Sequence, residues 1–412
     1  MRFEKAIVNA ESIITCAHTR GPKRGREMRE LYPVRKGVVG ISAAKIHWIG
    51  SLREYRSHHR ASREIDAQGG IVLPGFIDCH THALFAGTRE PEWQERLSGT
   101  AYLDILRRGG GILETVRLTR AAPPRHLFKI ASGYLEKMLR HGTTTIEIKS
   151  GYGLSLEAEI KLLRVIQRLK RALPLDIVST FLGAHAIPPE FSGRTEEYVS
   201  TVLRMLPKVK GLSEYCDVFC EEGAFNLDQA DRILTRAREL GFGVKLHAGE
   251  FHDLGGTDLA LRRQATSVDH LDVISEQAIK RLSRGSCIGV LLPGVTHFLS
   301  LQHFAPAREL IDAGVPVALA TDFNPGTSPC LSLQEIMGLA VLKMKMTPEE
   351  ALVGITVNAA AAIGMEQIVG SIEVGKQADL VCLDLKEISL IPYFFGTNHV
   401  RWAMKKGRML SG

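Results

Sequence analysis

The sequence predicts an α/β fold: a (β/α)8 TIM barrel joined to a small β-sandwich domain that both ends of the chain build. Short apolar or β-branched runs alternate with amphipathic stretches between residues 71 and 320, which is typical of a parallel sheet with crossover helices. The runs number eight, and the 412 residues suit a barrel of about 250 residues with a smaller companion. We therefore expect residues 69–365 to form the barrel, and residues 1–68 and 366–412 to form the β domain.

The predicted elements follow from the spacing of apolar residues along the chain. Residues 156–171 and 227–240 carry apolar side chains at three- and four-residue spacing, which predicts helices with one buried face. Near the two ends, short apolar runs lie beside turn-forming residues at 45–50, 370–376 and 378–383, which predicts strands of the small β domain. The predicted barrel strands are, in chain order, 71–79, 143–149, 176–182, 215–220, 242–246, 266–268, 287–292 and 316–320.

Composition indicates a soluble protein of the cytoplasm. Hydrophobic residues make up 45% of the chain and charged residues 24%, which is ordinary for a globular domain. The seven cysteines are odd in number, scattered and without a Cys-x-x-Cys pair, which favours reduced thiols. The first residues lack the apolar stretch of a signal peptide, and no apolar run approaches the roughly 20 residues of a membrane span. We expect no membrane partner.

The charge of the chain does not by itself indicate nucleic-acid binding. The net charge is +7 and the isoelectric point is near 9.0, but much of the excess lies in two runs, residues 20–35 and 53–63. Both runs are rich in turn formers and lack interleaved aromatic residues for stacking on bases. We interpret them as solvated loops that can also attract an anionic substrate, and we expect no nucleic-acid partner.

A pair of histidines ends the first predicted barrel strand, in the stretch "GFIDCHTH". In an extended chain, side chains alternate between two faces, so His80 and His82 point to the same side. Two imidazoles on one face can share a metal ion. The alternatives for such a pair are polar surface or a hydrogen-bonded pair in the core.

Further polar residues follow other predicted strands, where a barrel of this class places its active site. His185 follows the third strand, His247 ends the fifth, Asp269 and His270 end the sixth, and Asp322 ends the eighth. Three imidazoles and one carboxylate would bind zinc or ferrous iron and leave room for a water molecule. The predicted metal ligands are His80, His82, His247 and Asp322.

Several motifs resemble the metal-dependent amidohydrolase superfamily: "PGFIDCHTH", "LHAGE", "VDHL", "ATDFNPG" and "GSIEVGKQADLVCLD". Four others, "HALFAGTRE", "IEIKSGYGL", "FLGAHAIPPE" and "DFNPGTSP", closely resemble the imidazolonepropionase family, which hydrolyses 4-imidazolone-5-propanoate to N-formimidoyl-L-glutamate in histidine degradation. Together these motifs cover essentially the whole chain. The resemblance implies a barrel of the metal-dependent hydrolase type, a divalent or trivalent ion (zinc or iron) in each subunit, and a homodimer.

The fourth predicted barrel strand indicates how many metal ions each subunit binds. Dinuclear members of the superfamily carry a carboxylated lysine on a middle barrel strand. The fourth predicted strand here ends in Asp217-Val218-Phe219-Cys220-Glu221-Glu222, without a lysine, so we expect one ion per subunit. Lys149, at the end of the second strand, is expected to form a salt bridge or to position another residue.

The resemblance also implies the residues that bind a small substrate with a carboxylate tail. Arg89, Tyr152 and His185 are expected to hold the substrate, and a guanidinium group matches a carboxylate with two parallel hydrogen bonds. The alternatives are a surface arginine beside Glu90, a tyrosine that only packs, and a buried hydrogen-bonded histidine. The resemblance further implies a substrate or product loop at Asn324, Gly326 and Thr327, although Gly326 also suits a plain turn.

Three residues are candidates for moving protons while hydroxide from the metal attacks the ring carbonyl carbon and the ring C–N bond breaks. Asp322 can accept the proton of the water, His270 can orient that water or polarise the carbonyl, and Glu250 can hydrogen-bond the ring nitrogens and carry a proton. Purely structural roles remain open for Glu250 and His270. Other functions also remain open: another mononuclear ring hydrolase or deaminase of the superfamily, or a non-catalytic barrel scaffold. Retention of all four ligands counts against a scaffold.

Overall fold

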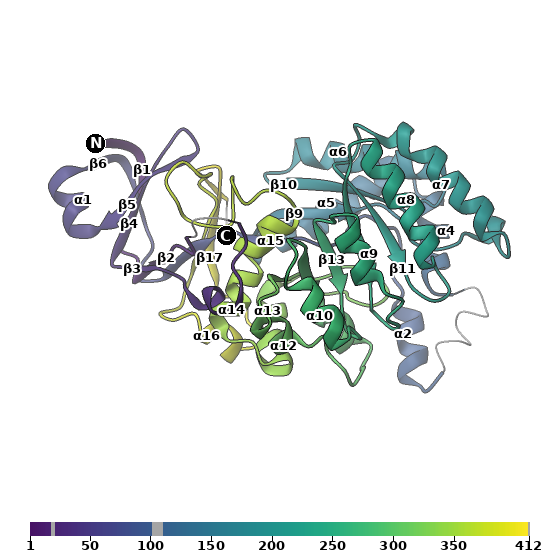
Figure 1. The fold of residues 1–412 in the computed structure, drawn as a ribbon. Coiled ribbons are helices and arrows are strands. Elements are labelled where there is room, and N and C mark those ends of the chain that lie inside the picture. Colours follow the sequence, from purple (N-terminus) through teal and green to yellow (C-terminus); the bar gives the residue numbers. More distant parts are fainter. Residues whose placement is uncertain (18–20, 101–109, 411–412) are drawn as a thin grey trace.

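The computed structural model describes residues 1–17, 21–100 and 110–410, and an eight-stranded parallel sheet forms its centre (Figure 1). Neighbouring strands pair in parallel from the first to the eighth, so the predicted (β/α)8 fold is confirmed. The strands are β8 (Phe76–Asp78), β9 (Thr143–Lys149), β10 (Asp176–Ala184), β11 (Tyr215–Cys220), β12 (Gly243–Ala248), β13 (Ser267–His270), β14 (Ile288–Leu291) and β15 (Val317–Leu319).

The first and last barrel strands meet just beyond their carboxyl ends. The backbone N–H of Asp322 donates to the carbonyl of His80 at 3.0 Å, and the N–H of His82 donates to the carbonyl of Phe323 at 2.9 Å. These two hydrogen bonds form the seam between β8 and β15. Two of the predicted metal ligands on the first strand therefore lie directly beside the predicted ligand on the last.

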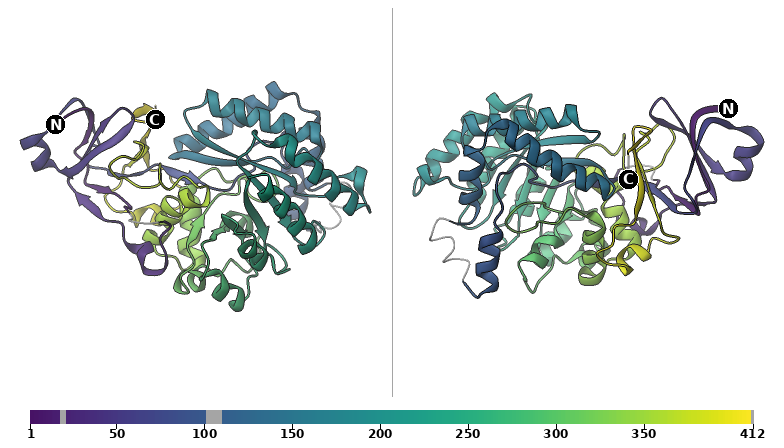
Figure 2. Two further views of the ribbon diagram at one scale, coloured as in Figure 1. Left: turned by 45° about the horizontal axis from the view of Figure 1, so that its top comes forward. Right: turned by 180° about the vertical axis from the view of Figure 1, so that it is seen from behind.

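Helices surround the barrel on its outside (Figures 1 and 2). The predicted helix 156–171 is α6, which begins at a Ser155 cap and buries Leu162, Ile166 and Leu169 at helical spacing. The predicted helix 227–240 is α8. The helices of the barrel are α2 (Glu90–Leu97), α4 (Ile112–Ala121), α5 (Pro124–Arg140), α6 (Leu156–Ala172), α7 (Thr195–Val209), α8 (Leu227–Glu239), α9 (Gly256–Arg262), α10 (Glu276–Leu282), α11 (Pro293–Phe298), α12 (Ala307–Asp312), α13 (Leu333–Met344), α14 (Pro348–Gly354) and α15 (Val357–Ala362).

Two further sheets lie at one side of the barrel, where Figure 2 also shows the two ends of the chain. Ile7 and Ile41 of the first sheet and Val72, Leu380 and Met404 of the second share one buried apolar cluster, as in a sandwich. The first sheet contains β5 (Lys45–Ser51), β4 (Gly37–Ser42), β1 (Arg2–Val8) and β6 (Arg60–Asp66). The second contains β18 (Arg408–Leu410), β17 (Val400–Lys405), β16 (Leu380–Leu383), β7 (Ile71–Pro74), β2 (Ser12–Ile14) and β3 (Pro33–Arg35).

The predicted first barrel strand, 71–79, is in fact two strands in two different sheets. Its first half is β7, which pairs with β2 and β16 in the terminal sheet, and only its second half, β8, joins the barrel. The chain passes from one sheet to the other at Gly75. A Cβ atom there would lie 2.2 Å from Oγ1 of Thr144, so only glycine fits this close passage.

Three smaller expectations about the ends differ from the structure. Residues 370–376 form turns and no strand, because Gly370 and Gly375 have φ of 92° and 93°. The basic run 53–63 forms a helix and a strand instead of a loop, since Ser51 and Glu54 make a capping box for the helix. Arg20, at the start of the other basic run, lies outside the described residues. The remaining short helices are α1 (Leu52–His58), η1 (Gly25–Arg29), η2 (Pro189–Phe191) and α16 (Leu390–Tyr393).

The structure also describes the state of the cysteines and the length and apolarity of the helices. All seven cysteines are free thiols, and six of them are buried. Within residues 1–17, 21–100 and 110–410, we find no helix whose length and apolarity would carry it across a bilayer.

Candidate metal centre and active site

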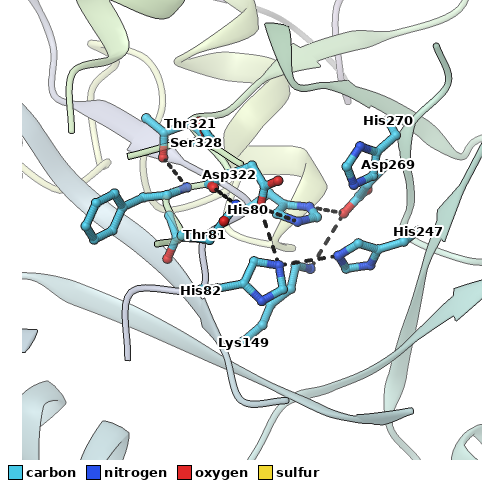
Figure 3. A network of polar contacts seen from close by, with 12 residues as sticks. His80, Thr81, His82, Lys149, His247, Asp269, His270, Thr321, Asp322 and Ser328 are labelled. Carbon is cyan, nitrogen blue, oxygen red and sulfur yellow. Dashed lines mark hydrogen bonds and ion pairs between the residues drawn. The ribbon is translucent and has the colours of Figure 1, made fainter. Parts of the chain in front are cut away.

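The four predicted metal ligands converge in the interior of the barrel mouth (Figure 3). His80 and His82 follow β8, His247 lies on β12, and Asp322 follows β15. Oδ1 of Asp322 lies 3.4 Å from Nε2 of His80 and 3.3 Å from Nε2 of His82, and Nε2 of His247 lies 3.5 Å from Nε2 of His82. All four side chains are buried. The alternative of polar surface is therefore wrong for His80 and His82.

These contacts have the spacing of ligands around one small cation. Nitrogen and oxygen atoms bonded to zinc at about 2.1 Å in a tetrahedron lie about 3.4 Å from one another. Nε2 of His80 and Oδ1 of Asp322 are buried, and neither has a hydrogen-bond partner among the described residues. Unpaired buried polar atoms are costly, and a cation between them would satisfy both. The residues present thus fit a single metal ion.

Burial favours the neutral imidazole form of His80 and His82, which is the form that can bind a metal. It holds the pKa of His80 and His82 well below the usual imidazole value, with Lys149 adding to the effect on His80 and His185 on His82. Neutral imidazoles keep the lone pair that a metal requires. Burial also raises the pKa of Asp322 well above the usual carboxyl value. A bound cation would offset this penalty and favour the carboxylate.

Two carboxylates and one lysine support the imidazoles, and Figure 3 shows two of these three residues, Asp269 and Lys149. Asp269 is 2.6 Å from Nδ1 of His80, and Asp217 is 3.0 Å from Nδ1 of His247. A carboxylate that accepts a hydrogen bond from Nδ1–H, as Asp269 can at His80, leaves Nε2 free to bind a metal. Nζ of Lys149 lies 2.7 Å from Asp217, 3.1 Å from Glu147 and 3.6 Å from Asp269. The predicted salt-bridging role of Lys149 is confirmed, whereas the partners Asp217 and Asp269 were not predicted.

The backbone is strained at two of the proposed site residues. His270 has φ of 82° and Asp322 has φ of 48°, in the left-handed region that residues with a side chain rarely adopt. Such conformations cost on the order of 1–3 kcal/mol and persist where surrounding structure enforces them, often at functional sites. At Asp322 the enforcing contact is the seam to His80.

Glu250 and His270 face each other at the edge of the site. Oε2 of Glu250 lies 3.6 Å from Nε2 of His270, whose Nδ1 is 4.0 Å from Asp272. Burial, with Asp322 adding repulsion, raises the pKa of Glu250 well above the usual carboxyl value, so this group tends to hold a proton. The loop that carries it is held by buried Glu221, which accepts hydrogen bonds from Phe251 N (2.9 Å) and His252 N (3.2 Å). Sequence reasoning missed Glu221.

Tyr152 and His185 lie beside the candidate metal centre. The His185 ring stacks on His82 with centroids 4.8 Å apart and planes 13° apart, and its Nδ1 is 3.1 Å from the carbonyl of Gly151. Tyr152 is buried, with its ring centroid 5.8 Å from that of His82. Buried Glu159 holds this loop by accepting hydrogen bonds from the N–H groups of residues 151, 153 and 154, a role that sequence reasoning missed.

Arg89 lies against the loop that follows β15, and Gly326 makes room for it. A Cβ atom at Gly326 would lie 2.0 Å from Nη1 of Arg89 and 2.7 Å from its Cζ. Nε of Arg89 donates to Glu92 at 2.9 Å, so its partner is not the neighbouring Glu90, and its side chain is only 11% exposed. The alternative of a free surface arginine is wrong. Gly326 lies in a turn but has an ordinary φ, so the space that Arg89 occupies, and not a left-handed backbone, requires the glycine.

The Asn324 side chain makes hydrogen bonds within its own loop. Its Oδ1 accepts from the N–H groups of Gly326 and Thr327, each at 2.8 Å, and its Nδ2 donates to the carbonyl of Asp322 at 2.7 Å. This arrangement fixes the backbone between Asp322 and the residue that contacts Arg89. Contact of Asn324 and Thr327 with a substrate stays a prediction.

Comparisons with known proteins show the family of the chain. The sequence model of the amidohydrolase family matches residues 71–410. The imidazolonepropionase of Alkaliphilus oremlandii (strain OhILAs) is 45% identical over 416 residues, which cover 100% of this chain and 98% of that protein. The imidazolonepropionase of Caldanaerobacter subterraneus subsp. tengcongensis is 47% identical over 408 residues, with 98% and 97% covered. The chain belongs to the imidazolonepropionase family of amidohydrolases.

Solved structures confirm the amidohydrolase fold at lower identity. Escherichia coli guanine deaminase superposes with a TM-score of 0.75 at 16% identity, covering 99% of this chain and 98% of that one. An adenosine deaminase from Xanthomonas campestris with bound zinc gives a TM-score of 0.73 at 18% identity, with 99% and 93% covered. At these identities the likeness concerns the fold alone, and the separation of imidazolonepropionases from deaminases depends on the full-length relatives.

Proposed function

We propose that the protein hydrolyses 4-imidazolone-5-propanoate to N-formimidoyl-L-glutamate. The observation that carries the proposal is the placement of one guanidinium group, that of Arg89, against Gly326 in the loop that begins at the ligand Asp322. A substrate with a reactive ring and a carboxylate tail matches one site with a cation-binding cluster and a fork of N–H donors. Full-length relatives named imidazolonepropionase support the same substrate.

His80, His82, His247 and Asp322 would hold the metal ion. When bound, such an ion lowers the pKa of a water molecule toward 7 and polarises a carbonyl group. Oδ1 of Asp322 would accept the proton of the attacking water, and its distances of 3.4 Å and 3.3 Å to Nε2 of His80 and His82 support this role. His270 orients the water or polarises the ring carbonyl from the neighbouring strand end.

Glu250 supplies the proton for the second half of the reaction. Burial raises its pKa and favours the protonated carboxyl group, which could donate to the ring nitrogen as the C–N bond breaks. His270, 3.6 Å away, keeps this group oriented. Arg89 binds the propanoate, while Tyr152 and His185 close the site beside His82, and the loop with Asn324, Gly326 and Thr327 contacts substrate or product.

The proposal also covers the metal content, the cellular location, the oligomeric state and the domain division of the enzyme. We propose one ion per subunit, zinc or iron, because the two groups of possible ligands, His80–His82–His247 and His80–His270–Asp322, share His80, and no lysine stands on β11. Seven free thiols support a cytoplasmic location. We further propose a homodimer, and a division into a barrel within residues 69–365 and a β domain at residues 1–68 and 366–412 whose second sheet also takes in β7 (Ile71–Pro74).

Metal analysis combined with a turnover assay tests the function. Purified protein should contain zinc or iron, and freshly generated imidazolonepropionate should be converted to N-formimidoyl-L-glutamate. A strong chelator should abolish turnover, and added Zn²⁺ or Fe²⁺ should restore it. Full activity of a demonstrably metal-free protein would contradict the mechanism. Hydrolysis of guanine or adenosine in preference to imidazolonepropionate would assign the chain to the deaminase alternative.

A further inference from the structure

Five charged side chains lie completely buried inside the barrel, below the candidate metal centre. Glu147 and Lys149 come from β9, Asp217 from β11, Lys245 from β12 and Asp269 from β13. Glu147 and Lys149 are two residues apart on one strand, so both point to the barrel interior. Burying charges is expensive, and apolar residues of similar size would fill a barrel at lower cost. The cluster therefore calls for an explanation beyond packing.

The two lysines of this cluster have different partners. Nζ of Lys149 contacts Asp217 at 2.7 Å and Asp269 at 3.6 Å, and these are the carboxylates at Nδ1 of His247 and His80. Among the ion pairs of the described residues, Lys245 pairs with Glu147 alone, at 2.9 Å, and its other hydrogen bond goes to the carbonyl of Cys79. Of these two lysines, Lys149 is the one that bridges the carboxylates next to two different ligand histidines.

We propose that Lys149 is a positioning residue of the metal centre. Its ammonium group holds Asp217 and Asp269 in place, and through them it orients the His247 and His80 rings so that both Nε2 atoms point at one ion. Without Lys149, two buried carboxylates face each other with no shared cation, and each can rotate away from its imidazole. This inference rests on the metal site of the proposed function but not on the identity of the substrate.

Metal affinity, measured without substrate, tests the inference. The metal-free wild type, Lys149→Met and Lys245→Met are titrated with Zn²⁺ against a chromophoric chelator. Methionine keeps the length of the side chain and removes the charge in both variants, so Lys245→Met is the matched control. Loss of an outer partner of a ligand histidine typically weakens metal binding 10–100-fold, and we expect this for Lys149→Met. Lys245→Met should stay within about threefold of wild type, even if its unfolding midpoint falls.

A spectroscopic signature separates positioning from general loosening. The visible absorption of bound Co²⁺ reports ligand geometry, and it should change in Lys149→Met and stay unchanged in Lys245→Met. If Lys149→Met does not fold, the double variant Glu147→Gln/Lys149→Met keeps the net buried charge and should show the same weakening. Wild-type affinity in the Lys149 variants, or equal weakening in Lys245→Met, overturns the inference. A wild type that binds metal but does not hydrolyse imidazolonepropionate overturns the proposed function and leaves this inference standing.

Discussion

Replacing Gly326 by alanine tests the placement of Arg89 without changing Arg89 itself. The added Cβ would lie 2.0 Å from Nη1 and 2.7 Å from Cζ, whereas ordinary contacts begin near 3.4 Å. The guanidinium group must therefore move by at least about 1 Å. A displacement of this size would misalign its hydrogen bonds to the propanoate of the substrate. Glu92 pairs with Nε at 2.9 Å, and this ion pair opposes a retreat of the whole side chain.

The expected loss follows from the interaction that the displaced group makes. A charge-assisted hydrogen bond to the propanoate contributes roughly 1.5–3 kcal/mol, so kcat/KM should fall about 10–150-fold. A substrate analogue without the carboxylate should be turned over by Gly326→Ala almost as well as by wild type. The matched control is Gly133→Ala in α5, where nothing lies within 4 Å of the added Cβ. That variant should keep wild-type kinetics.

A double-variant cycle decides whether Gly326 acts through Arg89. Steady-state kinetics are measured for Arg89→Ala, Gly326→Ala and the combination of both. Once the guanidinium is absent, the alanine at position 326 has nothing to displace, so the double variant should equal Arg89→Ala. Unchanged kinetics in Gly326→Ala, or a loss that adds fully to that of Arg89→Ala, would refute the reasoning.

Two further substitutions test protonation. Asp322→Asn should fold, as judged by circular dichroism, yet lose at least tenfold in kcat because an amide cannot accept the water's proton. A kcat within about threefold of wild type corresponds to a change of only about 0.65 kcal/mol in the activation free energy. That result would remove Asp322 from the proton path. Burial raises the pKa of Asp272 to about 7, so its stabilising protonated form is lost as pH rises through 7. Relative to wild type, Asp272→Asn should therefore gain stability to urea between about pH 4 and pH 7, the range between the ordinary and the raised pKa, and a difference independent of pH would contradict this.

The order of strands and the gathering of the ligands could be predicted because both follow from periodicity. Parallel strands in a barrel end at the same rim, so His80, His247 and Asp322 had to converge once their strands were recognised. The strand over 71–79 was misjudged because its apolar pattern continues through Gly75, and the change of sheet depends on a contact with Thr144 from another strand. Sequence alone contains no record of such a contact.

The supporting residues of the site were harder to predict. Asp217 and Asp269 stand inside apolar strands, which signals an inward charge, but a charge in a strand does not name its partner. A second signal of buried charge is the alternation "IEIK" at 146–149, where Glu147 and Lys149 share one face of an otherwise apolar strand. The left-handed backbone of His270 and Asp322 has no sequence signal, because neither residue type requires it.

The seam between β8 and β15 has a consequence for how the enzyme is made. During synthesis on a ribosome, His80 and His82 emerge long before Asp322, which is their neighbour only in the finished barrel. A nascent chain that ends before β15 has imidazoles but neither the carboxylate nor the backbone contacts that hold the first strand in position. Tight metal binding thus requires the completed barrel, because the proposed ligands His80, His82 and Asp322 come together only when β15 is in place.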